Sequence, residues 1–217
     1  MKFFKKVKIS WLIIAVVIIL VTYGIYNNPD RKLKNVNSEL GQILMDMQTT
    51  AQQVRNDITS NQPCFGDESL EKGTSAECVV NLRSIQDTFK NADKNNLTKL
   101  EKYYRVNKTN LDEETKNMVE NSLLLYKSNS YSDLMNAYDR YFTANIEWHK
   151  FFRDVVGIKG PDNMSDEELM QTKTLAQEML DAEDDLKLKT NAFSDYLHEN
   201  FDKEFIDNLT SSADKLK

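Results

Sequence analysis

Glycine and proline are rare in this sequence. Six glycines and three prolines among 217 residues leave long stretches without a helix-breaking residue. The sequence also lacks the alternation of apolar and polar residues that marks strands, and it has no internal repeats or low-complexity tracts. These absences exclude a β-sheet fold and a repeat array, and they favour an all-α protein.

Sequence motifs of catalysis are absent as well. No glycine-rich phosphate loop, no Gly-x-Ser-x-Gly turn and no paired cysteine and histidine nucleophile occur in the chain. Because no acid, base or nucleophile pair can be named, we expect no enzyme activity and no cofactor.

Histidine, a common metal ligand, occurs only twice. A di-iron helical bundle needs Glu-x-x-His on two helices, but Ile146 precedes His149 at that spacing and Asp195 precedes His198. The acidic residues at 181–185 lack the spaced oxygen donors and the glycine of a calcium loop, which favours a solvated helix face. We therefore expect no metal site, with His149 padding a helix and His198 at the surface.

Basic charge is scarce beyond the first few residues. The formal net charge is −6, and it is −10 without the four N-terminal lysines. A domain this acidic binds nucleic acid poorly, so we expect no nucleic-acid partner.

Only two cysteines are present, Cys64 and Cys78. The surrounding segment holds Pro63, Gly66 and Gly73, and we expect it to be a loop. In an oxidising compartment the two cysteines should pair, and closing this 15-residue loop would stabilise the fold by about 3 kcal/mol. Two free thiols are the alternative if the topology is inverted, and a zinc site is disfavoured by the spacing.

One apolar run contrasts with this polar background. Residues 9–26 are 18 residues without a charge, and as a helix they would span roughly 27 Å, close to the hydrocarbon thickness of a bilayer. We therefore predict a transmembrane anchor. The residues we assign to it are Trp11, Leu12, Ile19, Tyr23 and Tyr26.

The charges around this anchor predict its orientation. Residues 1–8 carry four lysines, so this basic N-terminus is expected in the cytoplasm and the bulk of the chain outside it. A cleaved signal peptide is the alternative, although no Ala-x-Ala site follows the run. Both interpretations place the remaining residues beyond the cytoplasmic (inner) membrane.

Residues 30–210 are predicted to form one coiled-coil-like bundle of four or five helices, followed by a frayed tail at 211–217. Apolar residues at steps of three and four predict helices over residues 33–60, 76–106, 112–128, 131–156 and 165–209. The first two should form a hairpin pinned by the disulfide. Gly157, Gly160 and Pro161 should end the fourth, and the stripe of the last includes Leu169, Met179, Leu186 and Phe193.

Aromatic residues concentrate on the fourth predicted helix. The residues that could contact a ligand or partner there are Tyr138, Tyr141, Phe142, Trp148, His149 and Phe152. An aromatic stripe at helical spacing is more often core than pocket, so both interpretations stay open.

These observations predict a membrane-anchored, non-enzymatic scaffold or interaction subunit, with the lipid bilayer and other membrane or envelope proteins as partners. The alternatives are a ligand-binding sensor that acts through a partner membrane protein, and a phage-type lysis or envelope-spanning coiled coil. The layout resembles that of LemA-type membrane proteins and of chemoreceptor-type four-helix sensors. The Asp-Leu-Ile-Pro-Asn stretch of the former and the second membrane span of the latter are absent, so the sequence identifies no family.

Overall fold

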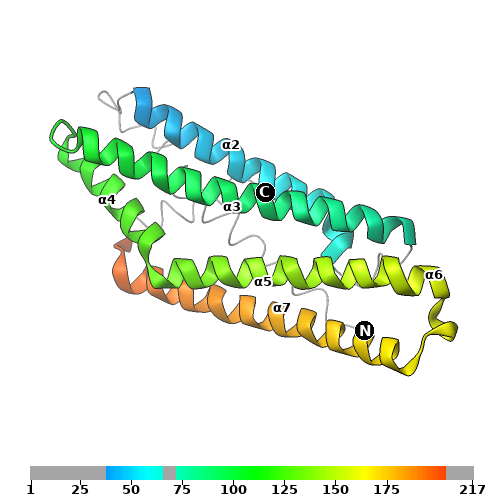
Figure 1. Cartoon of the computed structure of the whole chain (residues 1–217). Helices are drawn as coiled ribbons and strands as arrows, with labels where there is room; N and C mark the ends of the chain where they lie inside the picture. Colours follow the sequence, from blue (N-terminus) through cyan, green and yellow to red (C-terminus); the bar gives the residue numbers. More distant parts are fainter. Residues whose placement is uncertain (1–37, 66–71, 204–217) are drawn as a thin grey trace. The chain divides into compact units, whose positions relative to one another are not determined.

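The computed structural model describes residues 38–65 and 72–203, and every element in these ranges is helical (Figure 1). In chain order the elements are α2 (Ser38–Ser60), the 3-10 helix η1 (Gln62–Phe65), α3 (Lys72–Asn107), α4 (Glu113–Lys127), α5 (Asn129–Phe151), the π-helix η3 (Phe152–Val156), α6 (Gly157–Lys159), the 3-10 helix η4 (Pro161–Asn163) and α7 (Asp166–Asn200). The predicted all-α fold is confirmed for this part of the chain.

The predicted anchor at 9–26, with Trp11, Leu12, Ile19, Tyr23 and Tyr26, lies outside the described residues. The predicted tail at 211–217 lies outside them too. Within the ranges that the structure describes, no helix is both long enough and apolar enough to cross a membrane.

Side-chain caps fix the starts of α4 and α7. Asp112 accepts a hydrogen bond from the backbone N–H of Thr115 at 2.7 Å. At α7 the backbone N–H of Glu168 donates to Ser165 Oγ at 3.2 Å, and the N–H of Ser165 donates to Glu168 Oε2 at 2.9 Å. These contacts confirm the N-termini that the sequence predicts, the second as a capping box.

Three predicted helix ends are wrong. Helix α3 begins at Lys72 rather than 76, because Gly73 takes a place in its first turn. Gly157 keeps a helical φ of −68° after η3, so only Gly160, with φ 75°, ends this run. Helix α7 ends at Asn200 rather than 209, where the side-chain amide of Asn200 donates to the backbone of Tyr196 at 2.9 Å.

The chain divides into two compact units, which are described separately. The described part of unit 1 consists of residues 38–55, 89–132 and 192–203, and unit 2 consists of residues 56–88 and 133–191 without 66–71. Helices α2, α3, α5 and α7 each contribute residues to both units.

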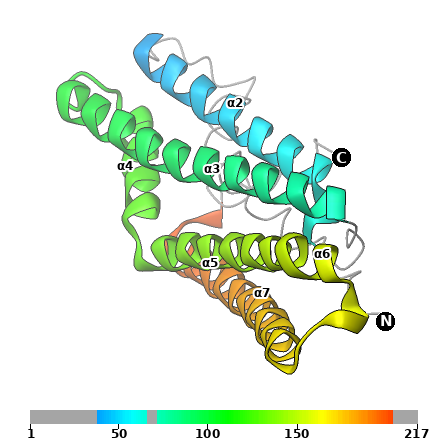
Figure 2. The same ribbon diagram turned by 45° about the vertical axis from the view of Figure 1, so that its right-hand side comes forward.

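In unit 1, helix α3 runs antiparallel to α2, whereas α4 crosses α3 near its end (Figures 1 and 2). Lys99 on α3 pairs with Asp46 on α2 at 2.8 Å, and Lys127 on α4 pairs with Glu101 on α3 at 2.7 Å. The buried side chains recur at helical spacing and fill the space between these helices. They include Leu40, Ile43, Met47 and Val54 of α2, Leu100 and Tyr103 of α3, Val119 and Leu123 of α4, and Phe193 of α7.

In unit 2, helices α5 and α7 lie side by side and antiparallel (Figures 1 and 2). Lys189 pairs with Asp133 at 2.8 Å, and Arg140 pairs with Asp185 at 2.8 Å. Helix α3 joins α5 through Gln86, whose side-chain amide donates to Asp139 Oδ1 at 2.6 Å. The core includes Cys64, Cys78, Leu82, Ile85, Leu134, Phe142, Ile146, Ala182 and Leu186.

Candidate functional site

The aromatic residues of α5 lie in the interior of unit 2. Tyr138, Tyr141, Phe142, Trp148 and His149 are all buried, and Phe152 of η3 is half-buried. The ring of Phe65 stacks on Tyr141 with 6.0 Å between centroids and meets the edge of Phe142 at 5.8 Å. The structure therefore places five of these six side chains in the buried core, and two of them, Tyr141 and Phe142, contact Phe65.

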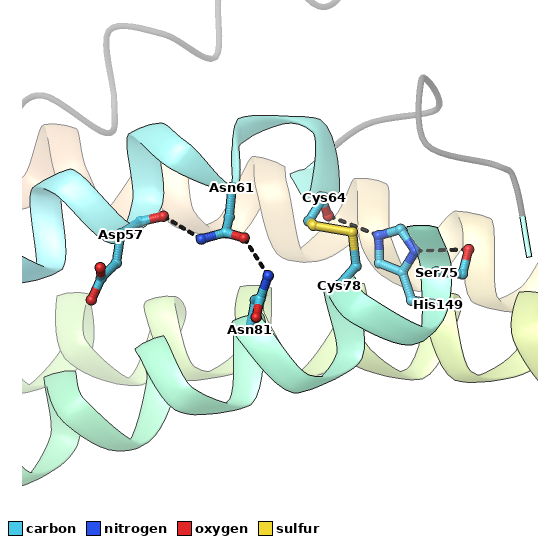
Figure 3. The surroundings of a disulfide bond; sticks show 7 residues. All are labelled: Asp57, Asn61, Cys64, Ser75, Cys78, Asn81 and His149. Carbon is cyan, nitrogen blue, oxygen red and sulfur yellow. Dashed lines mark hydrogen bonds between the residues drawn. A yellow bond between two sulfur atoms is a disulfide. The ribbon is translucent and has the colours of Figure 1, made fainter. Parts of the chain in front are cut away.

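A disulfide bond cross-links two segments of unit 2 (Figure 3). Cys64 in η1 and Cys78 in α3 are bonded, with 5.3 Å between their Cα atoms, which confirms the predicted pair. Both cysteines are buried. The bond fixes the end of the α2 segment to the start of α3, as expected for a pinned helical hairpin.

His149 reinforces this junction from α5. Its Nε2 lies 2.9 Å from the carbonyl oxygen of Cys64, and its Nδ1 lies 3.4 Å from Ser75 Oγ (Figure 3). In the neutral tautomer that fits both contacts, Nε2–H donates to Cys64 and Nδ1 accepts from Ser75. Burial lowers the pKa of His149, an effect that the bond to Cys64 partly opposes. A neutral, fully buried imidazole acts here as a structural bridge.

A second polar clamp lies beside the disulfide. The side-chain amide of Asn81 donates to Asn61 Oδ1 at 2.7 Å, and the amide of Asn61 donates to the backbone oxygen of Asp57 at 2.7 Å (Figure 3). The hairpin of unit 2 is thus held by a covalent bond, an imidazole and an asparagine pair. Sequence reasoning missed Ser75, Asn61 and Asn81, because no local pattern shows that they face these partners.

Helix α7 carries four of the exposed large apolar residues of unit 2. Leu169 is 43 % exposed, Met170 69 %, Leu180 48 % and Leu188 64 %. Leu169 and Leu180 are about three helical turns apart, and Met170 and Leu188 about five, so each pair lies in line along the helix. The sequence places Leu169 on the buried stripe; this is wrong, because it lies about 100° round the helix from Leu186.

Acidic side chains accompany this row. Asp166, Glu167, Asp181 and Asp184 are all exposed on α7, whereas Lys173 is the exposed cation between Leu169 and Leu180. We call Leu169, Met170, Leu180 and Leu188, with these acidic neighbours, the α7 stripe. A stripe of apolar residues with an acidic border can accept the apolar face of another helix.

No group of three histidine, cysteine, aspartate or glutamate side chains that could hold a metal ion occurs in the described ranges. Of the acidic residues at 181–185, Asp181 and Asp184 are exposed, and Lys187 pairs with Glu183 at 2.8 Å and with Asp184 at 3.1 Å. The features with functional potential are therefore the α7 stripe and the clamped hairpin. Comparison of the chain with known protein families, with curated proteins and with solved structures finds no match.

Proposed function

We propose that this protein is a non-enzymatic interaction subunit of a membrane or envelope complex, anchored by residues 9–26 and presenting its helices on the outer face of the cytoplasmic membrane. In this proposal the α7 stripe receives an amphipathic helix of a partner protein. The apolar run at residues 9–26 supports the membrane anchor, and the exposed apolar side chains of α7 support the partner site.

The exposure of the α7 stripe is the observation that carries the proposal. Single exposed apolar residues are normal on a protein surface and need no explanation. Here four large ones recur on one side of a single helix, while other apolar residues of the same helix, such as Ala182 and Leu186, are buried. If a partner covered Leu180 and Leu188, the complex would be stabilised by about 25 cal/mol for each Å² of apolar surface removed from water.

The acidic border favours a basic partner. Asp181 follows Leu180, and Asp166 and Glu167 precede Leu169, whereas the nearby Asp184 is already paired with Lys187 at 3.1 Å. A helix with lysine or arginine beside its apolar face would gain attraction there, whereas a second copy of α7 or an anionic lipid surface would be repelled. We therefore commit to a cationic amphipathic helix of another membrane or envelope protein.

The test is site-specific photo-crosslinking of the full-length chain in intact membranes. A photo-reactive residue at position 180 or 188 should give one discrete adduct that maps to a lysine- or arginine-rich amphipathic helix, and its yield should fall as salt is raised. A probe at Val106, which is 64 % exposed in unit 1, is the matched control and should not form that adduct. Adducts only with lipid or with a second copy of the chain would overturn the proposal, and so would an equal yield from position 106.

A further inference from the structure

The basic side chains near the end of α3 differ from those of the neighbouring helices. Lys94, Lys102 and Arg105 on α3, and Lys108 just past its end, are exposed, and their side chains have no partner among the described residues. In contrast, every lysine and arginine of α4 and α5 is paired with a carboxylate. These paired residues are Lys116, Lys127, Arg140 and Lys150.

The four unpaired cations lie along one face of α3. Lys94 and Arg105 are about three helical turns apart and therefore lie in line. Lys102 and Lys108 lie about 60° round the helix on either side of Arg105. We call these four residues the α3 ridge. All of them belong to unit 1.

The dipole of α3 explains only part of the α3 ridge. Cations are favoured at the C-terminus of a helix, but this attraction falls off within the last turn. It accounts for Arg105 and Lys108, because α3 ends at Asn107. Lys94 and Lys102 lie before that turn, so another interaction has to account for their charge.

The carboxylates closest to the α3 ridge in the sequence are engaged with other groups. Glu101 pairs with Lys127 at 2.7 Å. Asp112 caps the first turn of α4, and Glu113 lies 3.8 Å from the ammonium group of Lys116. The α3 ridge therefore presents unneutralised positive charge on a chain whose net charge is −6.

The α3 ridge reaches the end of unit 1 at which α2 begins. Lys99 pairs with Asp46 at 2.8 Å, and the antiparallel course of α2 and α3 places the last turns of α3 beside the start of α2 (Figure 1). Helix α2 starts at Ser38, soon after the proposed anchor ends at Tyr26. Fully extended, residues 27–37 reach at most about 40 Å. If residues 9–26 are the anchor, as the proposed function requires, the α3 ridge lies within reach of the membrane surface.

The chemistry of the α3 ridge favours phosphate headgroups over a protein partner. Protein interfaces have an apolar or aromatic centre, whereas the residue on this face between Lys94 and Lys102 is the polar Thr98. A layer of anionic headgroups attracts lysine and arginine through charge alone. We propose that the α3 ridge binds the anionic phospholipid headgroups of the membrane in which residues 9–26 are anchored.

The test is headgroup quenching with the full-length chain in vesicles. A fluorescent amino acid is placed at the exposed position 98, and a reference probe at the exposed position 136 on α5. The vesicles are phosphatidylcholine alone, or phosphatidylcholine and phosphatidylglycerol in equal parts, each with a nitroxide-headgroup lipid as quencher. Position 98 should be quenched in the phosphatidylglycerol vesicles only, and less so as salt is raised, while position 136 should not differ between the two.

Charge variants separate the α3 ridge from the total charge of the chain. Lys94→Gln with Lys102→Gln and Arg105→Gln should weaken the contact about fivefold for each cation, or about a hundredfold together, so that quenching is lost. The charge-keeping set Lys94→Arg, Lys102→Arg and Arg105→Lys should retain it. The matched control removes three exposed lysines outside the α3 ridge and should be quenched as the parent is. Its substitutions are Lys127→Gln, Lys159→Gln and Lys173→Gln.

Several outcomes would overturn the inference. They are equal quenching of position 98 in both vesicles, quenching that survives removal of the three ridge cations, and release of position 98 by inorganic phosphate at constant ionic strength. A discrete protein adduct from a photo-reactive residue at position 98 in intact membranes would assign the α3 ridge to an acidic protein instead. Flotation with phosphatidylcholine vesicles tests the anchor separately: a chain that floats without quenching refutes the α3 ridge alone, and one that does not float refutes the anchor as well.

Discussion

The imidazole of His149 is bonded to the backbone of Cys64, 85 residues earlier in the chain, through an Nε2–O distance of 2.9 Å. The contact joins α5 to the residue that carries one end of the disulfide (Figure 3). His149 is also fully buried, so no water can replace it as a partner. The stability of the hairpin in unit 2 should therefore depend on this ring.

Replacing His149 with phenylalanine should destabilise the protein by about 1–3 kcal/mol, because the carbonyl of Cys64 would be left buried and unpaired while the ring volume is kept. Urea unfolding followed by circular dichroism measures the change. His198→Phe is the matched control at an exposed position and should stay within about 0.5 kcal/mol of the parent. Equal midpoints for the two variants would contradict the bridging role.

Mild acid should weaken the fold through the same residue. Burial lowers the pKa of His149, so below about pH 6.5 the unfolded chain binds a proton that the folded chain resists. Stability contributed by the neutral ring is therefore complete above pH 6.5 and is lost as the pH falls toward the folded pKa. Unfolding free energies at pH 7.5 and 5.5 should differ more for the parent than for His149→Phe; an identical pH dependence would count against this assignment.

Removing the disulfide should have a larger effect. Reduction, or the paired change Cys64→Ser with Cys78→Ser, should lower the unfolding free energy by about 2–4 kcal/mol, because the unfolded chain regains the freedom of a closed loop. Urea titrations with and without reductant give the difference. Because both sulfurs are held in the disulfide, neither cysteine should be alkylated without reductant, even in denaturant, and labelling of both cysteines under those conditions would disprove the pairing.

A substitution at Asp93 should instead stabilise the protein at neutral pH. Its carboxylate accepts the phenol of Tyr131 at 2.6 Å, yet burial raises its pKa. Because burial raises the folded pKa of Asp93, the stability contributed by its protonated form is complete below about pH 3.8 and is lost as the pH rises from there through the higher folded pKa, so the ionised group weakens the fold at neutral pH. Asp93→Asn keeps an acceptor for Tyr131 and should raise the urea midpoint at pH 7. A lower midpoint would show that the ionised carboxylate is needed.

The location of the chain can be tested directly. If residues 9–26 anchor the protein with its N-terminus inside, protease added to cells with a permeabilised outer layer but an intact inner membrane should digest the helical bundle. A tag at the N-terminus should stay protected. A bundle that resists protease until the inner membrane is lysed would invert the topology.

Local signals predicted much of this fold correctly. Asp112 and Ser165 correctly predict the starts of α4 and α7. An N-cap is visible in the sequence because its side chain bonds to a backbone N–H within the next turn. The disulfide could also be predicted from the sequence, since no other cysteine competes for either sulfur. Gly73 and Gly157 were wrongly predicted to lie outside the helices. A glycine lowers the stability of a helix but does not end it when the neighbouring turns are stable.

Tertiary contacts explain what the sequence could not show. Nothing near His149 in the chain indicates that it meets Cys64 and Ser75, and nothing near Leu169 indicates that no helix of unit 2 covers it. The burial of Asn96 is of the same kind, because an asparagine inside a polar stretch reads as surface. Periodicity therefore predicted the helical bundle, whereas the contacts of His149 and the exposure of the α7 stripe depend on which helix faces meet.

The Cys64–Cys78 bond also affects how any cleavage of this protein must be analysed. A nick anywhere in residues 65–77 would leave two fragments that migrate as one molecule in electrophoresis without thiol. Digestion at that segment would then pass unnoticed, and the chain would be scored as intact. Only reduced gels would release an N-terminal fragment that includes residues 9–26 from the larger remainder.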